Sequence, residues 1–409
     1  MSKIDELIKQ YCPNGVEYKK LYEVTIWDKK FNGTTKKMQP NTVEFNHVSA
    51  KLLKDLYDAT GDIKLLSTGN FDGFTTTEKA SEFINKGEVL TIPSGGSANL
   101  KYYNGKFVDS GNILATSLDS NLYNLKYIWY FLNNINGEIQ NLFRGSSVQH
   151  PDMVSILNIR IPIPPLPVQE EIVKILDKFV ELEAELEAEL EARKVQYEFY
   201  RGELFNNENI QTFKLKDLFN IKNGFTPSKR NASFWSNGII PWFRMEDVRK
   251  NGGILNDAIQ YVTEEATKGN IFPANSIIVS TSATIGEHAL ITVPFLANQR
   301  FTCMMLKKKF EKNINMKYIY YYCFRLGEYC KKNVQQGNFN SVSVNVFKNF
   351  EFNIPSVKEQ QRIVSILDKF DKLINDISEG LPAEIEARRK QYEYYRNKLL
   401  SFEELNCEC

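Results

Sequence analysis

The sequence is poor in the residues that metal sites and catalytic centres most often use. Its 409 residues include three histidines, at positions 47, 150 and 288, which lie too far apart to show a zinc-ligand spacing. Its six cysteines form no paired CxxC motif, so reduced thiols in a cytoplasmic protein are expected. We therefore predict no metal site and no catalytic residue in this chain.

Other patterns are missing as well. No apolar run approaches the roughly 18 residues of a membrane span, and the N-terminal MSKIDELIKQ lacks the apolar core of a secretory signal. A phosphate-binding GK[ST] loop, a dinucleotide fingerprint and a GxSxG elbow are all absent. Lys and Arg (51) nearly balance Asp and Glu (50), so any nucleic-acid binding must come from local patches.

The chain contains one stretch twice. QEEIVKILDKF at residues 169–179 returns as QQRIVSILDKF at residues 360–370, an offset of 360 − 169 = 191. EARKVQYEFYR at residues 191–201 returns as EARRKQYEYYR at residues 386–396, an offset of 386 − 191 = 195. Two matches at nearly one offset indicate an internal repeat, in which one half of the chain copies the other.

The repeated stretch has the pattern of a long helix. Ile175, Phe179 and Leu182 follow each other at steps of four and three, which is typical of a helix that packs against another helix. The first copy continues through three ELEA units (residues 181–192), whereas residues 378–382 of the second copy, SEGLP, should interrupt or kink it. Each helix of roughly 35–40 residues would span on the order of 55 Å. A coiled coil with a purely structural role is the alternative interpretation.

Each long helix follows a globular region with both strand and helix signals. Strand-like runs occur at residues 89–92, 113–116 and 276–280, and aromatic helix candidates at residues 125–132 and 318–324. The proline run at residues 161–167 should be extended. We predict an α+β fold with globular modules at residues 1–165 and 207–355, long helices at residues 166–206 and 356–402, and a tail at residues 403–409.

The modules share this order of parts but differ in sequence, which suits one task performed on two different targets. Their loops are rich in Arg, Asn, Gln, Ser and Thr, the side chains that hold phosphates and contact base edges. An ordinary polar loop is the alternative for each of them.

Taken together, these motifs resemble the specificity subunits of type I restriction–modification systems over essentially the whole chain. The resemblance rests first on the duplicated helix motifs. It also rests on FWSNGIIPWFRMEDVR, KGNIFPANSIIVSTSATIGEHALI and LANQRFT in the second half, and more loosely on CPNGVEYKKL and IPIPPLPVQEEIV in the first.

The resemblance implies two target-recognition domains separated by two long antiparallel helices that form a coiled coil with a pseudo-two-fold repeat. Each domain would read one half of a bipartite site in double-stranded DNA. The helices would set the spacer and dock two modification (methyltransferase) subunits, and restriction (endonuclease and translocase) subunits would join them. S-adenosylmethionine, Mg and ATP would bind those partners, so this chain would itself be non-catalytic. It would be a bacterial, cytoplasmic protein that takes part in DNA methylation and in defence against foreign DNA.

Two rival classes remain at this point: a structural coiled-coil adaptor with two protein-binding modules, and a standalone DNA-modifying enzyme. The absence of an NPPY- or DPPY-type motif argues against the enzyme. Under the resemblance, partner docking falls to Tyr197, Tyr200, Tyr392 and Tyr395, with packing between the helices as the alternative. The predicted DNA contacts are Ser94, Ser97, Lys101, Arg144, Ser146, Ser147, Lys229, Arg230, Arg244, Arg249, Ser282, Thr284, Arg300, Asn338 and Asn340.

Overall fold

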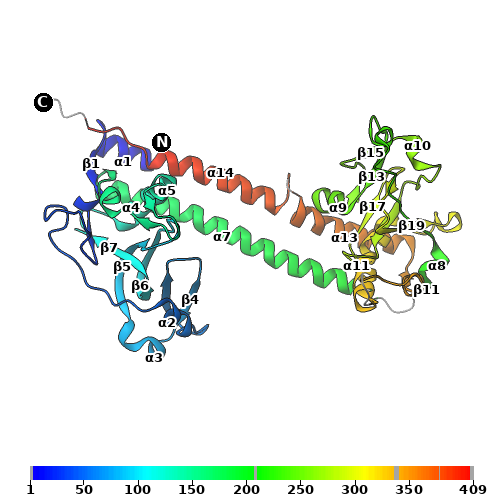
Figure 1. Cartoon of the computed structure of the whole chain (residues 1–409), viewed down its shortest axis with the longest axis horizontal. Helices are drawn as coiled ribbons and strands as arrows, with labels where there is room; N and C mark the ends of the chain where they lie inside the picture. Colours follow the sequence, from blue (N-terminus) through cyan, green and yellow to red (C-terminus); the bar gives the residue numbers. More distant parts are fainter. Residues whose placement is uncertain (1–2, 207–209, 336–339, 377, 406–409) are drawn as a thin grey trace. The chain divides into compact units, whose positions relative to one another are not determined.

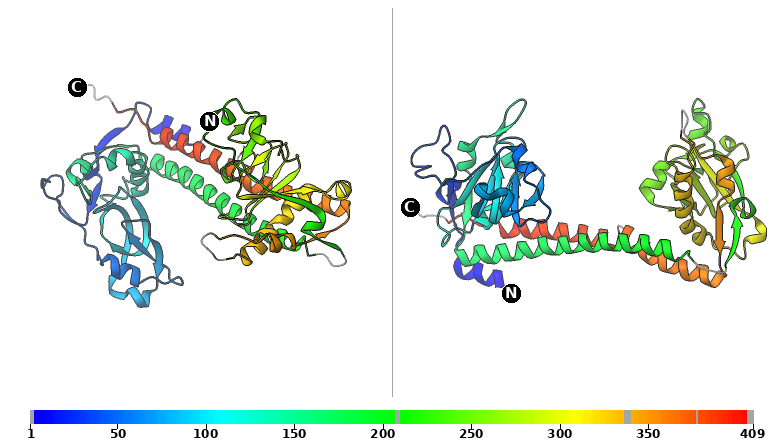
Figure 2. Two further views of the ribbon diagram at one scale, coloured as in Figure 1. Left: turned by 45° about the vertical axis from the view of Figure 1, so that its right-hand side comes forward. Right: turned by 90° about the horizontal axis from the view of Figure 1, so that it is seen from below.

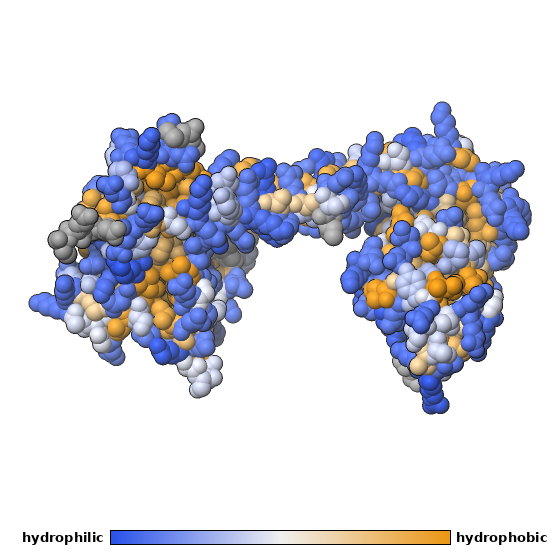
Figure 3. Space-filling view, turned by 90° about the horizontal axis from the view of Figure 1, so that it is seen from above, coloured by the Kyte–Doolittle hydropathy of each residue, from blue (hydrophilic) through white to orange (hydrophobic). Residues whose placement is uncertain are grey.

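The computed structural model describes residues 3–206, 210–335, 340–376 and 378–405. The chain divides into unit 1, made of Met1–Leu186 and Ile385–Cys409, and unit 2, made of Glu187–Glu384. In each unit the strands gather into sheets with helices beside them (Figure 1), and hydrophilic residues cover much of the visible surface with apolar patches between them (Figure 3). Helix α7 (Leu166–Glu203) is unbroken and contributes residues to both units.

Unit 1 is built on a six-stranded sheet. All its neighbouring strands are antiparallel except β3 and β6, which are parallel. The central strand β5 is buried from Val89 to Pro93, which explains its continuous apolar sequence. The sheet order is β2 (Thr25–Trp27), β7 (Asn112–Ser117), β5 (Asn85–Pro93), β6 (Lys101–Ser110), β3 (Ile63–Ser67) and β4 (Asp72–Thr75).

Short elements complete unit 1. Helix α1 (Lys3–Tyr11) lies beside the first turns of α7 (Figure 2), where Lys3 Nζ is 2.5 Å from Glu171 Oε2. The other elements are β1 (Glu17–Lys20), β8 (Phe143–Arg144), β9 (His150–Pro151), β10 (Arg160–Ile163), η1 (Leu21–Glu23), α2 (Ala50–Asp55), α3 (Thr77–Ala80), η2 (Ser81–Phe83), α4 (Leu125–Asn134), α5 (Asn136–Gln140) and α6 (Met153–Leu157).

Unit 2 repeats the topology of unit 1 on a different sequence. Its main sheet has the order β12 (Phe219–Asn223), β19 (Phe301–Leu306), β16 (Ser276–Ser280), β17 (His288–Ile291) and β14 (Ile254–Leu255). The first three pairs are antiparallel and the last is parallel, as in β2-β7-β5-β6-β3 of unit 1. Each strand of this sheet therefore has a counterpart in unit 1.

A second, three-stranded sheet of unit 2 has the order β15 (Tyr261–Val262), β13 (Ile240–Phe243) and β18 (Leu296–Ala297). His288 is a satisfied strand residue, since its ring nitrogens lie 3.1 Å from the carbonyl oxygens of Gly286 and Tyr320. The remaining elements are β11 (Gln211–Lys214), β20 (Glu351–Ile354), α8 (Leu215–Leu218), η3 (Ala232–Trp235), α9 (Met245–Asn251), α10 (Glu264–Thr267), η4 (Lys308–Phe310), α11 (Met316–Lys332) and α12 (Val344–Lys348).

In unit 1, a buried glutamine joins the start of the long helix to the module. The Gln169 Oε1 atom accepts from the main-chain N–H of Asn124 at 2.8 Å. Its Nε2 atom donates to the carbonyl oxygens of Leu122 at 2.9 Å and Pro164 at 2.7 Å. The side chain is fully buried, so these bonds replace all its contacts with water.

Unit 2 contains the same junction. Gln360, also fully buried, accepts from the N–H of Asn315 at 2.8 Å and donates to the carbonyl oxygens of Asn313 and Pro355, both at 2.9 Å. The two sets share one offset, because 360 − 169 = 315 − 124 = 191. We call Gln169 and Gln360, with these main-chain partners, the glutamine junctions.

A carboxylate two turns further along each helix makes a second repeated contact. Asp177 accepts from Lys126 Nζ at 2.7 Å and from the Tyr130 hydroxyl at 2.6 Å. In unit 2, Asp368 accepts from Lys317 Nζ at 2.8 Å and from the Tyr321 hydroxyl at 2.7 Å. Burial, together with the carboxylate, raises the pKa of both tyrosines, so each hydroxyl remains a donor.

Within each unit the apolar seam pairs α7 with the second repeat of the helix. In unit 1, Phe179 packs on Tyr395 with ring centroids 5.6 Å apart, while Arg389 pairs with Glu183 at 2.6 Å, so the two segments run antiparallel. In unit 2, Phe370 packs on Tyr200, also at 5.6 Å. The predicted helix–helix seam is confirmed.

The second repeat is interrupted where the sequence indicates. Helix α13 (Val357–Asn375) ends and α14 (Leu381–Leu399) begins on either side of Gly380. A Cβ atom at Gly380 would come within 2.6 Å of the carbonyl oxygens of Asp376 and Lys372, so glycine is required there. The expectation that residues 161–167 are wholly extended is wrong for the last two of them. Helix α7 starts at Leu166, and Pro167 occupies its first turn, where proline costs no hydrogen bond.

The glutamine junctions yield a stability prediction. Gln360→Ala leaves the N–H of Asn315 and two carbonyl oxygens without their partner, and should lower the free energy of unfolding by about 1–3 kcal/mol. Gln169→Ala should cost a similar amount, whereas Gln361→Ala, an exposed neighbour in α13, should cost little. Urea unfolding measures all three. Equal stability of the Gln360 and Gln361 variants would contradict the account.

Candidate DNA-recognition surface

The predicted contact residues of unit 1 meet at the carboxyl end of β5. The turn that follows β5 packs against the β8–β9 hairpin, where the N–H of Gly96 donates to the carbonyl oxygen of Gln149 at 2.8 Å. His150 Nδ1 lies 2.6 Å from the carbonyl oxygen of Ser94. The structure thereby brings Ser94 and Ser97 beside the hairpin, whose exposed tip carries Arg144, Ser146 and Ser147.

One predicted contact in unit 1 has partners within the module. Lys101 Nζ donates to the carbonyl oxygens of Ser67 at 2.6 Å and Gly69 at 2.7 Å. Its ammonium group therefore holds the loop after β3 in place, and Lys101 stays a predicted DNA contact. Arg144 is still 72% exposed although its Nε atom lies 3.4 Å from Asp152 Oδ2, and it stays a predicted DNA contact.

Unit 2 builds a corresponding edge at the carboxyl end of β16. The N–H of Thr281 donates to the carbonyl oxygen of Arg300 at 3.3 Å. The carbonyl oxygen of Thr281 in turn accepts from the N–H of Val342 at 3.0 Å. Ser282 forms a β-bridge with Ser341, the chain neighbour of the exposed Asn340. Three separate loops thus converge at this edge, one of them carrying Arg300.

The turn after β16 is held in place by a side-chain hydrogen bond and by close packing against α11. Ser280 Oγ donates to the carbonyl oxygen of Ser282 at 2.9 Å, and Ala283 adopts a left-handed conformation with φ of 63° that costs a non-glycine residue free energy. Gly286 lies so close to Gly327 of α11 that a Cβ atom on either residue would be 2.8 Å from the other's carbonyl oxygen. Ser282 and Thr284 are therefore presented on a fixed backbone.

Three arginines of unit 2 that are predicted DNA contacts differ in their surroundings. Arg249 pairs with Glu287 at 2.8 Å beside this turn, and its side chain is 60% exposed. Arg244 is only 25% exposed; its Nη2 atom lies 2.8 Å from Glu246, and its buried Nε has no hydrogen-bond partner. Arg300 is exposed, and among the described residues no carboxylate lies within ion-pair distance of it.

Two further predicted contacts of unit 2 lie in one loop. Lys229 and Arg230 are exposed in the loop after β12, which is held where the N–H of Phe225 donates to the carbonyl oxygen of Ala297 at 2.8 Å. Asn338 lies outside the described residues.

The predicted docking tyrosines do not share one environment. Tyr197 is only 8% exposed and packs on Phe370, and burial raises its pKa to about 12, so its assignment to docking is corrected to helix packing. Tyr392 is also partly buried, against Phe179. Tyr200 and Tyr395 remain 38% and 37% exposed.

Each of these two exposed tyrosines has a more exposed aromatic neighbour in the same repeated motif. Phe199 is 63% exposed and packs edge-on against Tyr200. Tyr394 is 62% exposed and packs edge-on against Tyr395. We call Phe199–Tyr200 and Tyr394–Tyr395 the exposed aromatic pairs.

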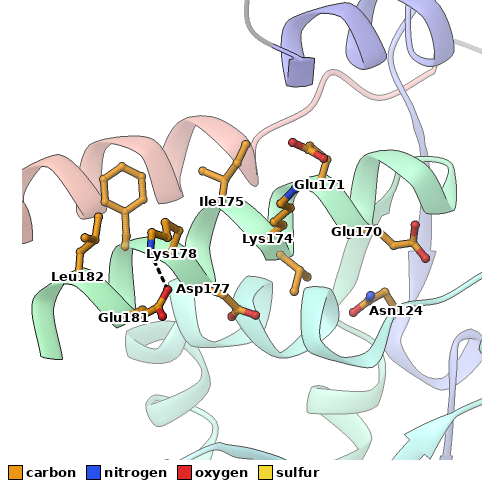
Figure 4. Close-up of a pocket in the computed structure, with 11 residues that line it drawn as sticks. Asn124, Glu170, Glu171, Lys174, Ile175, Asp177, Lys178, Glu181 and Leu182 are labelled. Carbon is orange, nitrogen blue, oxygen red and sulfur yellow. Dashed lines mark hydrogen bonds and ion pairs between the residues drawn. The ribbon is translucent and has the colours of Figure 1, made fainter. Parts of the chain in front are cut away.

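Each unit also has a groove along its long helix. In unit 1 it has a volume of about 730 Å³, and its walls come from successive turns of α7 and from Asn124 at the start of α4 (Figure 4). The groove of unit 2 has a volume of about 380 Å³. Its seven lining residues, Asn315, Gln361, Val364, Ser365, Asp368, Lys369 and Lys372, correspond at the 191-residue offset to Asn124, Glu170, Val173, Lys174, Asp177, Lys178 and Glu181 of the first.

An ionic cluster in unit 1, in which two buried carboxylates contact an exposed histidine, has no recognisable sequence motif. His47 Nδ1 lies 2.8 Å from Asp109 Oδ2, and His47 Nε2 lies 3.0 Å from Asp28 Oδ2. Hydrogen bonding to Asp109 and then to Asp28 raises the pKa of His47 to about 9, so the ring is protonated at neutral pH. We call these three residues the histidine clamp.

These features define a two-module nucleic-acid recognition protein, in which one topology presents two different polar edges. Residues 44–192 and 207–387 each match the type I restriction modification DNA specificity domain. The chain is 35% identical to the EcoR124I/EcoR124II specificity subunit of Escherichia coli over 370 residues, which cover 85% of this chain and 89% of that one. The chain belongs to the family of type I restriction–modification DNA specificity subunits.

Further relatives agree. The EcoprrI specificity subunit of Escherichia coli is 48% identical over 213 residues, which are 50% of this chain and 53% of that relative, so the match spans about half its length. The S subunit of M. genitalium shares the fold with a TM-score of 0.57 at 15% identity, covering 94% of this chain and 96% of that one. The HsdS subunit of Thermoanaerobacter tengcongensis does so with a TM-score of 0.53 at 13% identity, covering 95% and 97%.

As a member of this family, the chain is a non-catalytic subunit that supplies DNA sequence recognition, while catalysis lies in partner subunits. No helix in the described part of the chain is long and apolar enough to cross a membrane.

The histidine clamp predicts a pH dependence. Because the pKa of His47 is raised from 6.5 to about 9 in the folded state, its stabilising effect is fully present below about pH 6.5 and is lost as the pH rises through about 9. Urea unfolding between pH 6 and pH 10 should show this loss, and His47→Gln should remove this part of the pH dependence. An identical pH profile for the variant would exclude the clamp as its source.

Proposed function

We propose that each module reads one half of a bipartite site in double-stranded DNA. The proposal rests on one observation. The two units share an arrangement of five strands, but the loops that follow the corresponding strands β5 and β16 have different side chains. Serine and threonine hydroxyls and exposed guanidinium groups on fixed turns are suited to contacts with base edges and phosphates. Two unlike edges then specify two unlike half-sites.

The long helix is suited to set the distance between half-sites. At about 1.5 Å per residue, the 38 residues of α7 correspond to about 57 Å of uninterrupted helix. At about 3.4 Å per base pair this length corresponds to about seventeen base pairs.

Deletion of residues 185–188, one ELEA unit, tests the spacer. It removes about 6 Å of helix, which is slightly more than one turn. The apolar residues before and after the deletion therefore stay on nearly the same side of the helix. We expect methylome sequencing of cells that carry the variant to show the same two half-sites with a spacer shorter by one or two base pairs. Replacing the same four residues by alanine keeps the length and should leave the spacer unchanged. An unchanged spacer in the deletion variant would refute the proposed role.

We further propose that the two grooves and the neighbouring exposed aromatic pairs dock two modification subunits, one for each unit. The grooves lie at equivalent positions, because their lining residues share the 191-residue offset. Such a repeated surface suits two copies of one partner. Restriction subunits would join this complex in the cytoplasm, and S-adenosylmethionine, Mg and ATP would bind the partners.

Substitutions in the exposed aromatic pairs test the docking. Phe199→Ala and Tyr394→Ala, which truncate rings more than 60% exposed, should each weaken the binding of one modification subunit, and together of both. Native mass spectrometry of the co-expressed complex measures the stoichiometry. Leu118→Ala and Ile239→Ala, exposed apolar residues outside the long helices, serve as controls. Full occupancy of both sites in the double variant would rule out this surface.

A further inference from the structure

We propose that residues 28–47 of unit 1, here called the lysine loop, bind the DNA backbone phosphates of the first half-site. The inference rests on the proposed function and adds a contact surface to the first module that lies outside the predicted contact residues.

The lysine loop is a fixed structure although it lacks regular secondary structure for most of its length. Gln39, which is 4% exposed, accepts from the N–H of Phe31 and from the Thr34 hydroxyl, both at 2.9 Å. Its Nε2 atom donates to the carbonyl oxygen of Lys29 at 3.0 Å. Phe31 packs edge-on against Trp27 at 5.9 Å. The histidine clamp joins the two ends of the loop, because Asp28 and His47 both belong to it.

The loop turns its positive charges outward. Lys29, Lys30, Lys36 and Lys37 are all exposed, and among the described residues none of them has a carboxylate within ion-pair distance. Elsewhere in unit 1, Lys79 and Lys126 are paired with Asp58 and Asp177. Four unpaired ammonium groups on one held loop form a local cationic surface in a chain of net charge +1.

Two contacts place the lysine loop beside the predicted DNA contacts. His47 forms a β-bridge with Asp109, two residues before Gly111, whose carbonyl oxygen accepts from the N–H of Ser94 at 3.0 Å. Gly33 lies against Val154, since a Cβ atom there would be 3.3 Å from the Val154 side chain. Val154 belongs to α6, which directly follows the β8–β9 hairpin. The loop thus flanks both elements of the contact edge.

The second module carries a basic pair at the corresponding place. The lysine loop follows β2, whose counterpart in unit 2 is β12, because each is the edge strand antiparallel to β7 or β19. The loop after β12 presents Lys229 and Arg230, and the lysine loop presents Lys36 and Lys37. Two modules of unlike sequence keep a basic pair after the same strand.

The chemistry favours phosphate over bases. A lysine ammonium is a point charge on a flexible stem, without the planar fork that arginine offers to guanine. Contacts of this kind position the duplex and carry no sequence information.

The test uses the full chain in complex with its modification subunits. Lys36→Gln with Lys37→Gln should weaken binding to a duplex that carries the methylated motif and to a scrambled duplex by the same factor. If two phosphate contacts are lost, the slope of log K against log salt should become shallower by about 1.8. Fluorescence anisotropy between 50 and 200 mM salt measures both effects. The matched control is Lys86→Gln with Lys106→Gln, an exposed cross-strand pair at the other end of β5, which should leave the slope unchanged.

The outcomes separate the two proposals. A wild-type complex that binds motif and scrambled duplexes equally would refute the proposed function, whatever the variant does. A wild-type complex that discriminates, with an unchanged salt slope in the variant, would refute the lysine loop. Weaker binding to the motif duplex alone, or loss of a modification subunit, would also refute it. Lys29→Gln with Lys30→Gln repeats the measurement should the first variant fail to fold.

Discussion

The two glutamine junctions are the constraint on which the rest of the structure depends. Gln169 and Gln360 each bind one main-chain N–H and two main-chain carbonyl oxygens of their module. Because the partners are main-chain groups, the side chains of the module are free to change without loss of these bonds. This explains how one helix motif is kept at a 191-residue offset while the modules diverge. A buried amide that lost any of these partners would cost stability, so the junction also fixes where each long helix begins.

Within each module, the sheet and the loops have separate tasks. Strands β5 and β16 are buried along their apolar runs, and their carboxyl ends open into turns held by main-chain hydrogen bonds. The free energy that orders these turns comes from the sheet and from close contacts such as that of Gly286 with Gly327. The exposed side chains on the turns are therefore free to specify a ligand.

The sequence predicts the local features well, because helical seams and breaks depend on near neighbours. The break before Pro382 and the pairing of Phe179 with the second repeat follow from such patterns. Burial is different, since it depends on what packs from elsewhere. Lys101 and Tyr197 look like surface residues in sequence, yet one holds a loop and the other a seam. The glutamine junctions were detectable, because NLKYIWY at residues 124–130 and NMKYIYY at residues 315–321 keep the 191-residue offset. The histidine clamp joins residues up to 81 positions apart (109 − 28) and has no such signal.

The central claim is that two unlike modules on one repeated scaffold each specify their own stretch of DNA. Methylome sequencing of cells with and without this chain tests it most directly. The account predicts a motif with two defined halves and an undefined spacer of fixed length, methylated only when the chain is present. A single continuous motif, or a methylome that does not change when the chain is removed, would contradict it.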